Sequence, residues 1–349
     1  MRAHVTVGLI STAFLGVVAL GGSVAGQSGR HLNPQVDLLA AKKPIFGLGV
    51  PSARGGGPGR GARGGDPAAT PTPPAPQPPP KTPLELAKDA IAHPEADYFF
   101  FGGMERGVDN ALPGFTTLMD AIVEAGGIAT SPYKRLLVPI NVKTPNISSA
   151  EQPADPARYV ANISRQLNVG VTTISFVEVD SAEELRQGIA AMRFKSKGGT
   201  RPDDIGQAPK YWGLSEAEYR RKADVWPLNP EGELVVWAII ETKEGIANLR
   251  EIAKVPGLAV IAAGAGSLGG VFSTTNAEGQ RVRDTAAWEE AIQKIAATCK
   301  EFKIPCAYPV NENDIETRMQ QGYNVAILQS FNDAAFRAVA KGRQIAGRQ

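Results

Sequence analysis

The sequence holds few of the side chains that most often serve as proton carriers in enzymes. Its 349 residues include three histidines, His4, His31 and His93. His4 lies in the N-terminal segment, His31 in a polar lead-in, and His93 at the end of a predicted helix. Because none directly follows a predicted strand, a histidine general base is not expected.

Cysteine is also scarce, with Cys299 and Cys306 as its two examples. Cys299 ends a helical pattern and Cys306 begins an apolar run. Neither has a neighbouring histidine, so neither is expected to act as a nucleophile. We interpret them as two small buried residues. A disulfide is the alternative, because the sequence does not show whether their Cα atoms approach closely enough.

An excess of charge of one sign is missing as well. The chain has 37 Lys and Arg against 35 Asp and Glu, a formal net charge of +2. This balance gives no reason to expect a nucleic-acid partner. With 43% hydrophobic and 21% charged residues, the composition is that of a globular protein with one domain of roughly 250 residues plus appendages.

Long apolar runs are confined to the N-terminus. Val5–Gly22 is uncharged, follows Arg2, and precedes the small residues Ser23, Val24 and Ala25. This pattern predicts a secretory signal peptide over residues 1–25 and export to the periplasm or the medium, an oxidising space. The alternative is an uncleaved membrane anchor.

Residues 52–82 lack the apolar side chains needed to pack. They are rich in Gly and Arg and then in Pro, with the run PTPPAPQPPP. We predict a disordered or polyproline-II linker here. Contact of Arg54, Arg60 and Arg63 with an anionic surface is the less favoured alternative.

The rest of the chain alternates between apolar runs of strand length and helical patterns. The predicted strands are Pro44–Val50, Tyr98–Phe101, Leu136–Val142, Thr172–Val177, Leu234–Ile240, Leu258–Ala263, Cys306–Val310 and Asn324–Leu328. Helices are predicted at 38–43, 82–93, 118–123, 157–167, 181–192, 215–223, 246–252, 284–299, 312–320 and 333–345, with capping boxes at Thr82–Glu85 and Ser181–Glu184. Eight strands that are each followed by a helix predict a (β/α)8 TIM barrel in a single domain, 26–347, interrupted by the linker. An open doubly wound sheet is the alternative.

One segment breaks this rhythm. Arg193–Gly232 is long and contains Tyr211, Trp212, Tyr219 and Trp226. We expect it at the carboxyl-terminal edge of the sheet, as a lid or subunit contact, or else as a packed surface element.

The stretch Val235–Gly270 is the centre of the functional argument. Its first strand ends on a single carboxylate, Glu241, and its second ends on a Gly-rich turn, Gly264–Gly270. Parallel-sheet proteins bind ligands at the carboxyl ends of their strands, so a site is expected at both positions. As a phosphate cradle the turn is weakly supported, because it lacks the spacing and the lysine of a P-loop.

These segments resemble the HpcH/HpaI aldolase/citrate lyase family, also called the pyruvate/phosphoenolpyruvate-binding barrels. The resemblance is carried by Ile240-Glu241-Thr242, Val255-Pro256-Gly257, Gly264–Gly269, Gly170–Met192, Phe194–Pro202 and Tyr98–Gly107, in the family's order. It implies a class II pyruvate aldolase-like lyase that uses Mg2+ or Mn2+ to hold a small 2-keto acid. The metal stabilises the enolate of that keto acid.

The resemblance also implies the roles of particular residues. Glu241 corresponds to the first metal ligand, Ser267 replaces the second, which is an Asp, and Gly264, Gly266, Ser267 and Leu268 form the substrate-facing loop. In the second strand end, Gly103 replaces an Asp and Arg106 replaces the His. Asn141 replaces an Arg, with Lys143 nearby. Glu105 and Glu178 are the carboxylates expected to supplement Glu241.

Three consequences follow from these replacements. Glu241 with a serine hydroxyl makes a weak divalent site. Arg106 is expected to bind the anion in place of a metal, or to pair with Glu241. Because arginine is always protonated, it is a poor general base. The plainer alternatives are that Glu241 is an ordinary strand-end carboxylate and Arg106 a surface residue.

Two hypotheses about function remain. The first is a divergent carbon–carbon lyase, with Arg106 and Glu105 as catalytic residues, that acts on a small 2-keto acid or another carboxylate. The second is a non-catalytic exported barrel that binds a small carboxylate or acts as a scaffold. By analogy with the family, the chain is expected to form a homo-oligomer through the last helix, Asp333–Ile345.

Overall fold

Eight parallel strands form the centre of the protein. In this computed structural model the described residues are 1, 31–52, 79–146 and 155–348. The barrel strands are β1 (Ile45–Gly49), β2 (Tyr98–Phe101), β5 (Ile140–Thr144), β6 (Thr173–Phe176), β8 (Leu234–Ile240), β9 (Val260–Ala263), β12 (Cys306–Pro309) and β13 (Val325–Ile327). The predicted signal peptide and residues 53–78 of the predicted linker lie outside the described residues.

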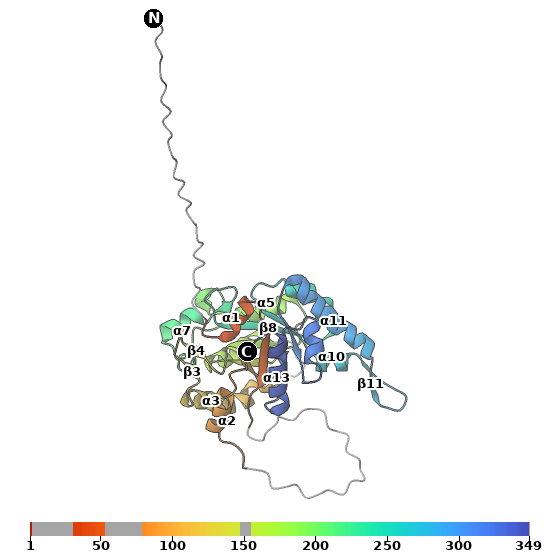
Figure 1. Ribbon diagram of the computed structural model, residues 1–349, viewed down its shortest axis with the longest axis horizontal. Coiled ribbons are helices and arrows are strands. Elements are labelled where there is room, and N and C mark those ends of the chain that lie inside the picture. The colour runs from red at the N-terminus through yellow and green to blue at the C-terminus, as the bar shows by residue number, and fades with distance from the viewer. Residues whose placement is uncertain (2–30, 53–78, 147–154, 349) are drawn as a thin grey trace. The chain divides into compact units, whose positions relative to one another are not determined.

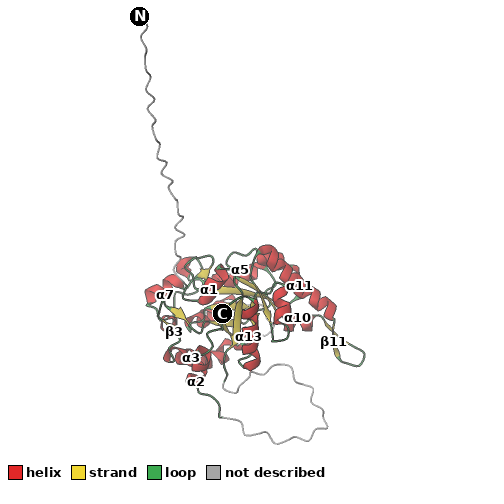
Figure 2. Cartoon of the chain, in the orientation of Figure 1, coloured by secondary structure: helices red, strands yellow, loops and turns green. Residues whose placement is uncertain are grey.

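The pairing of the strands closes the barrel. The sheet order is β6-β5-β2-β1-β13-β12-β9-β8, and β6 also pairs with β8, where Ser175 is the register partner of Trp237. The predicted (β/α)8 fold is confirmed, and an open doubly wound sheet is excluded because the sheet has no free edge within this ring. Helices surround the strands in Figures 1 and 2.

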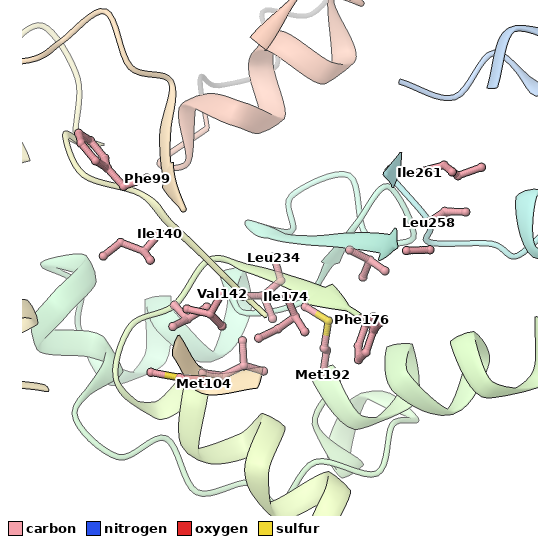
Figure 3. Close-up of a cluster of buried hydrophobic side chains, with 14 of the residues drawn as sticks. Phe99, Met104, Ile140, Val142, Ile174, Phe176, Met192, Leu234, Leu258 and Ile261 are labelled. Carbon is pink, nitrogen blue, oxygen red and sulfur yellow. The ribbon is translucent and has the colours of Figure 1, made fainter. Parts of the chain in front are cut away.

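The strands are apolar on both faces, as a parallel barrel requires. In β8, Val235, Trp237 and Ile239 point into the barrel, where they join the inner cluster of side chains. The alternate residue Leu234 faces the helices. Figure 3 shows this outer layer, in which Leu234, Ile174 and other strand residues pack with Met192 of a covering helix.

Most helices overlap their predicted positions, whereas Ala208–Trp212 and Ala265–Val271 were not predicted as helices. They are α1 (Pro34–Ala40), α2 (Pro83–Ile91), α3 (Val108–Glu124), α4 (Pro156–Asn168), α5 (Ala182–Met192), α6 (Ala208–Trp212), α7 (Glu216–Lys222), α8 (Lys243–Ala247), α9 (Leu249–Ala253), α10 (Ala265–Val271), α11 (Thr285–Phe302), α12 (Ile315–Gln320) and α13 (Asp333–Ile345). Two short hairpins, β3–β4 (Ile128–Ala129, Arg135–Leu136) and β10–β11 (Ser273–Thr275, Arg281–Arg283), were not predicted. None of the described helices combines the length and apolarity needed to traverse a bilayer.

The two predicted capping boxes have different outcomes. Thr82 and Glu85 exchange both hydrogen bonds at the start of α2. At α5, the Ser181 side chain accepts from the backbone N–H of Glu184. The Glu184 carboxylate accepts from the backbone N–H of Asp180 over 3.0 Å, and the backbone N–H of Ser181 also acts on it and lowers its pKa. At Ser181, the half of the predicted box that the serine side chain makes is confirmed.

The segment Gly264–Gly270 is not a turn. Apart from Gly264, which precedes it, the segment lies in helix α10. The glycine content of this segment favoured a turn in the sequence analysis. The segment also has a helical pattern, in which the apolar residues Ala265 and Leu268 are buried.

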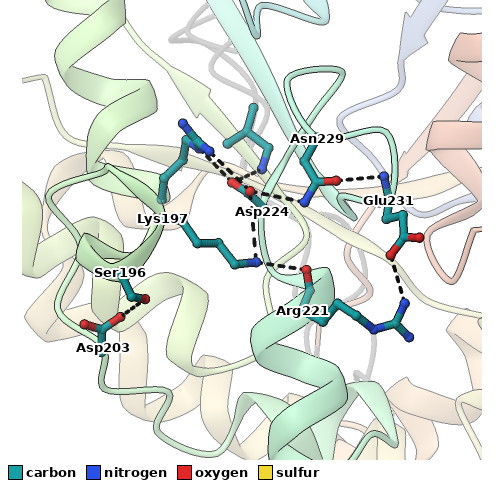
Figure 4. Close-up of polar contacts among 9 residues, drawn as sticks. Ser196, Lys197, Asp203, Arg221, Asp224, Asn229 and Glu231 are labelled. Carbon is teal, nitrogen blue, oxygen red and sulfur yellow. Dashed lines mark hydrogen bonds and ion pairs between the residues drawn. The ribbon is translucent and has the colours of Figure 1, made fainter.

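The segment 193–232 lies at the opposite end of the barrel from its predicted place. It follows α5, which runs back toward the amino ends of the strands, and its strand β7 (Val225–Trp226) pairs with the start of β8. Trp212 and Tyr219 are fully buried. Figure 4 shows the polar cluster around Asp224, which accepts from Arg193 Nε over 2.7 Å. The lid interpretation is wrong, and the packed alternative holds.

The two cysteines form a disulfide, contrary to the favoured interpretation of separate buried residues. Cys299 and Cys306 have Cα atoms 5.7 Å apart, and both are buried. Helix α11 ends at Lys303, whose φ of 57° is left-handed, and the chain turns back so that the N–H of Ile304 donates to the Cys299 carbonyl. This turn brings two residues seven positions apart together.

Candidate active site

A cavity of about 140 Å3 opens at the carboxyl-terminal mouth of the barrel. It is lined by Phe100, Lys143, Ile239, Glu241, Ala262, Ala263, Gly264, Ala265, Gly266, Ser267, Pro309, Ile327 and Gln329. These residues lie in the last two positions of barrel strands or within a few residues after them. The position is the one at which barrel enzymes place their chemistry.

Glu241, the first residue after β8, is the central carboxylate of the cavity. Its side chain is almost completely buried, with 4% exposure. Burial raises the pKa of Glu241, and the Lys143 charge, a hydrogen bond with the Ser267 side chain and the Glu178 N–H oppose that rise. The Glu178 N–H donates to Oε1 of Glu241 over 3.0 Å. Glu178 adopts the left-handed region, with φ 48°, a costly conformation for a non-glycine residue.

Gly264 leaves room for this carboxylate. A Cβ at Gly264 would lie 2.3 Å from Cβ and 2.9 Å from Oε2 of Glu241. The two strand ends therefore meet at a distance that only glycine allows. Of the other loop residues in the prediction, Gly266 and Ser267 line the cavity. Leu268 is fully buried in the layer between strands and helices, away from the ligand space.

Lys143 is the cation of the cavity. It lies on β5 two residues after Asn141, and both point into the barrel because alternate strand residues share a face. Its Nζ donates to Oε2 of Glu105 over 3.0 Å, and its side chain is 18% exposed. The sequence interpretation mentioned Lys143 only as a neighbour of Asn141. Lys143 could have been identified from the sequence because it lies near the end of a predicted strand, on the face that points into the barrel.

The short 3-10 helix η1 (Gly103–Arg106) follows β2 and contains both residues that were predicted to be catalytic, Glu105 and Arg106. Their side chains have different surroundings. Glu105 reaches the cavity through its contact with Lys143. Arg106 is exposed and is not among the residues that line the cavity. The cation beside Glu241 is thus Lys143, in the place where the sequence interpretation expected Arg106.

Asn141 lies deeper than the cavity. It is fully buried, and its Oδ1 accepts from Ser175 Oγ over 2.7 Å. Its Nδ2 has no hydrogen-bond partner within the described part of the chain, and the same holds for Nε1 of Trp237. Asn141 does not line the cavity, so we expect it to act through its contacts inside the barrel and not by direct contact with a ligand.

The side chains at the mouth do not fit the divalent metal that the resemblance implies. Glu241 is the one carboxylate that lines the cavity, and its Oε1 is engaged by a backbone N–H. Glu105 is held by an ammonium group. Within residues 31–52, 79–146 and 155–348, no group of three or more His, Cys, Asp or Glu is arranged to hold a metal ion. A hard cation requires more oxygen ligands than these residues offer.

A family model settles the relationship of this chain to known proteins. The model of the HpcH/HpaI aldolase/citrate lyase family matches residues 153–330, just over half of the sequence. The chain belongs to this family. No curated protein sequence matches the chain.

Solved structures agree with the fold. A HpcH/HpaI aldolase/citrate lyase family protein from Burkholderia cenocepacia J2315 has a TM-score of 0.58 at 14% identity, over 90% of this chain and 98% of its own. The HpcH/HpaI aldolase from Desulfitobacterium hafniense DCB-2 has a TM-score of 0.54 at 15% identity, over 90% and 96%. Macrophomate synthase has a TM-score of 0.53 at 17% identity, over 90% and 88%. At these identities the likeness establishes the barrel alone.

Proposed function

We propose that the protein is a carbon–carbon lyase that binds a small 2-keto acid at the mouth of the barrel without a divalent metal. The observation that carries the proposal is the placement of Lys143 and Glu241 in one cavity at the strand ends. Membership of an aldolase and lyase family supports the reaction class.

The charges of the cavity suit an anionic ligand. Lys143 supplies a positive charge that attracts the carboxylate and the 2-keto oxygen of such a molecule. Glu105 holds the Lys143 ammonium in place over 3.0 Å. Burial raises the pKa of Glu241, which makes its protonation less costly, and a protonated carboxyl can donate to an oxyanion instead of repelling it.

Calorimetric titration with pyruvate in the presence of EDTA tests this assignment. The wild-type chain is expected to bind pyruvate, and Lys143→Met is expected to weaken binding by at least about tenfold because the charge-assisted contact is lost. Glu241→Gln keeps a neutral hydrogen-bonding group and is expected to bind pyruvate nearly as well. Absence of binding in the wild type, or binding that appears only when Mg2+ or Mn2+ is added, contradicts the proposal.

A second candidate function is a non-catalytic barrel that binds a small carboxylate. It is favoured by the positions of the histidines that the structure describes, because neither His31 nor His93 lies in the cavity. His93 stacks on Phe336, and its Nδ1 lies 2.6 Å from Glu95. His31 lies 3.5 Å from Glu233 at the amino ends of the strands. Pyruvate binding without any turnover or enolisation supports this candidate over the lyase.

Export of the protein is a further part of the proposal. It rests on the signal-peptide pattern of residues 1–25, and a disulfide suits an oxidising compartment. N-terminal sequencing of the mature protein is expected to show cleavage near Ala25. An intact Met1 in the mature protein contradicts export by this route.

We also propose a homo-oligomer formed through α13. Ala338 and Val339 face the barrel, whereas Ile345 at the end of the helix is 44% exposed. Native mass spectrometry is expected to show an oligomer that Ile345→Glu weakens. A monomer at micromolar concentration rules this out.

A further inference from the structure

Lys143 combines three features that together suit covalent chemistry with a carbonyl group. It is the one amine among the residues that line the cavity. Its side chain is 18% exposed, so the amine is largely enclosed while still facing the ligand space. A carboxylate, that of Glu105, lies 3.0 Å from Nζ and can exchange a proton with it.

The floor of the cavity favours a dehydration step. Phe100, Ile239 and Ile327 line it, and all three side chains are buried. Apolar surroundings limit the access of water, and loss of water is a step of imine formation. Lysine is the side chain that forms imines with carbonyl substrates.

An aldol-type cleavage of a 2-keto acid needs a group that accepts the electron pair released from the breaking bond. In a metal-dependent lyase the cation has this role. Here the cavity offers one carboxylate and no metal-ligand set among the described residues. An iminium ion at C2 of the keto acid is an electron acceptor that Lys143 can form with the substrate.

We propose that Lys143 is a nucleophile that forms an imine with the C2 carbonyl of the 2-keto acid, and that Glu105 carries the protons of this step. The proposal rests on the assigned function of the same cavity. It names a covalent intermediate and two catalytic roles that binding alone does not require.

The atoms and charges of the step balance as follows. Glu105 takes one proton from the Lys143 ammonium, and the nitrogen lone pair then forms a bond to C2. The carbonyl π electrons move to oxygen, which takes a proton from the nitrogen and becomes the carbinolamine hydroxyl. Glu105 returns its proton to that hydroxyl, the C–O bond breaks, and water leaves. The net change is ammonium plus ketone to iminium plus water, with Glu105 regenerated as a carboxylate.

Reductive trapping tests the imine directly. The full chain is incubated with pyruvate and EDTA, sodium borohydride is added, and the digested protein is analysed by mass spectrometry. Hydride reduction of the imine is expected to leave an N-(1-carboxyethyl)lysine at position 143, and omission of pyruvate is expected to abolish it.

Three variants give the trapping experiment its controls. Lys143→Arg keeps a cation beside Glu105, so it is expected to bind pyruvate within about tenfold of wild type but to form no adduct. Glu105→Gln removes the proton carrier and is expected to slow trapping by about 100-fold or more. Lys243→Arg changes a lysine that lies over the Phe272 ring outside the cavity lining, and trapping is expected to equal that of the wild type.

The outcomes separate the two proposals. Pyruvate binding without an adduct at Lys143, or adducts spread over other lysines to the same extent, overturns the imine and leaves the binding function in place. Failure of the wild-type chain to bind pyruvate overturns both. Circular dichroism of Lys143→Arg confirms that a lost adduct does not reflect unfolding.

Discussion

Burial acts on two carboxyl groups near the mouth of the barrel and pushes their pKa values in the same direction. Glu241 faces the cavity, and its raised pKa favours the proposed binding of an anion because the carboxyl is more easily protonated. Glu184 sits on α5 behind the site, and burial raises its pKa from 4.5 to about 7. The backbone N–H of Asp180 donates to Glu184, which opposes the rise only in part.

The titration of Glu184 predicts a pH dependence of stability. Because the folded-state pKa is raised, the unfolded chain loses this proton first as pH rises, and stability present below pH 4.5 is lost as pH rises through about 7. Glu184→Gln removes the titration. The difference in unfolding free energy between variant and wild type is expected to change by roughly 1–2 kcal/mol over this range, less than the full linkage because the carboxyl is partly exposed.

Urea unfolding of both proteins below pH 4.5 and above pH 7 measures this change. Glu183→Gln, an exposed neighbour on the same helix turn, is the matched control. An unchanged difference between wild type and Glu184→Gln across the two conditions contradicts the assignment.

At the scale of elements, the connection from β9 into α10 shapes the cavity. Gly264→Ala would place a methyl group against Glu241, and the local backbone, with φ −77°, accepts alanine without strain. The cost is therefore one of contact. We expect a loss of about 1–3 kcal/mol in unfolding free energy and weaker pyruvate binding, because the carboxylate must move.

Gly266→Ala is the matched control for this contact. A Cβ at Gly266 meets no protein atom within 4 Å, so this variant is expected to keep wild-type stability. Equal effects of the two substitutions, measured by urea unfolding and calorimetry, count against a special role for Gly264.

The sequence pattern was enough to predict those helices and strands that are determined by their own residues. Leu234–Ile240 and Asp333–Ile345 were predicted at their observed bounds, because a continuous apolar run and a capped amphipathic helix are both visible along the chain. Gly264–Gly270 was mistaken for a turn, because glycine content outweighed the spacing of Ala265 and Leu268 in that interpretation. The closed ring of strands followed from the regular alternation itself.

The candidate site was predicted only in part, because its contacts join distant positions. Glu241 and the loop Gly264–Ser267 were located from their strand ends. The contact of Lys143 with Glu105 spans 38 positions, and that of the Glu178 N–H with Glu241 spans 63. Neither leaves a periodic signal in the sequence. Lys143, and not the predicted Arg106, is therefore the cation of the cavity.

At the scale of the described domain, a buried carboxylate, that of Asp97, links the first strand to the C-terminal end through a salt bridge and a hydrogen bond. Arg348 donates to both oxygens of Asp97, over 2.7 and 2.6 Å, and the N–H of Phe46 in β1 donates to the same carboxylate. Asp97 is 7% exposed. Arg348 thus stabilises β1, the strand that pairs with β13, through Asp97.

Arg348→Ala is expected to lower the unfolding free energy by about 2–4 kcal/mol, because it removes the bidentate partner of a buried carboxylate. Arg337→Ala removes an exposed pair with Glu312 and is expected to cost less than about 1 kcal/mol. Chemical denaturation of both variants checks the contrast. Equal costs mean that the C-terminal ion pair does not stabilise the barrel.

Metal-free enolisation is the central claim of this account, and proton exchange at the pyruvate methyl group measures it most directly. Proton NMR of pyruvate in deuterium oxide with EDTA and the full chain is expected to show loss of the methyl signal. Lys143→Met is expected to abolish that loss. A methyl signal that persists with EDTA and disappears only when Mg2+ or Mn2+ is added would contradict the account.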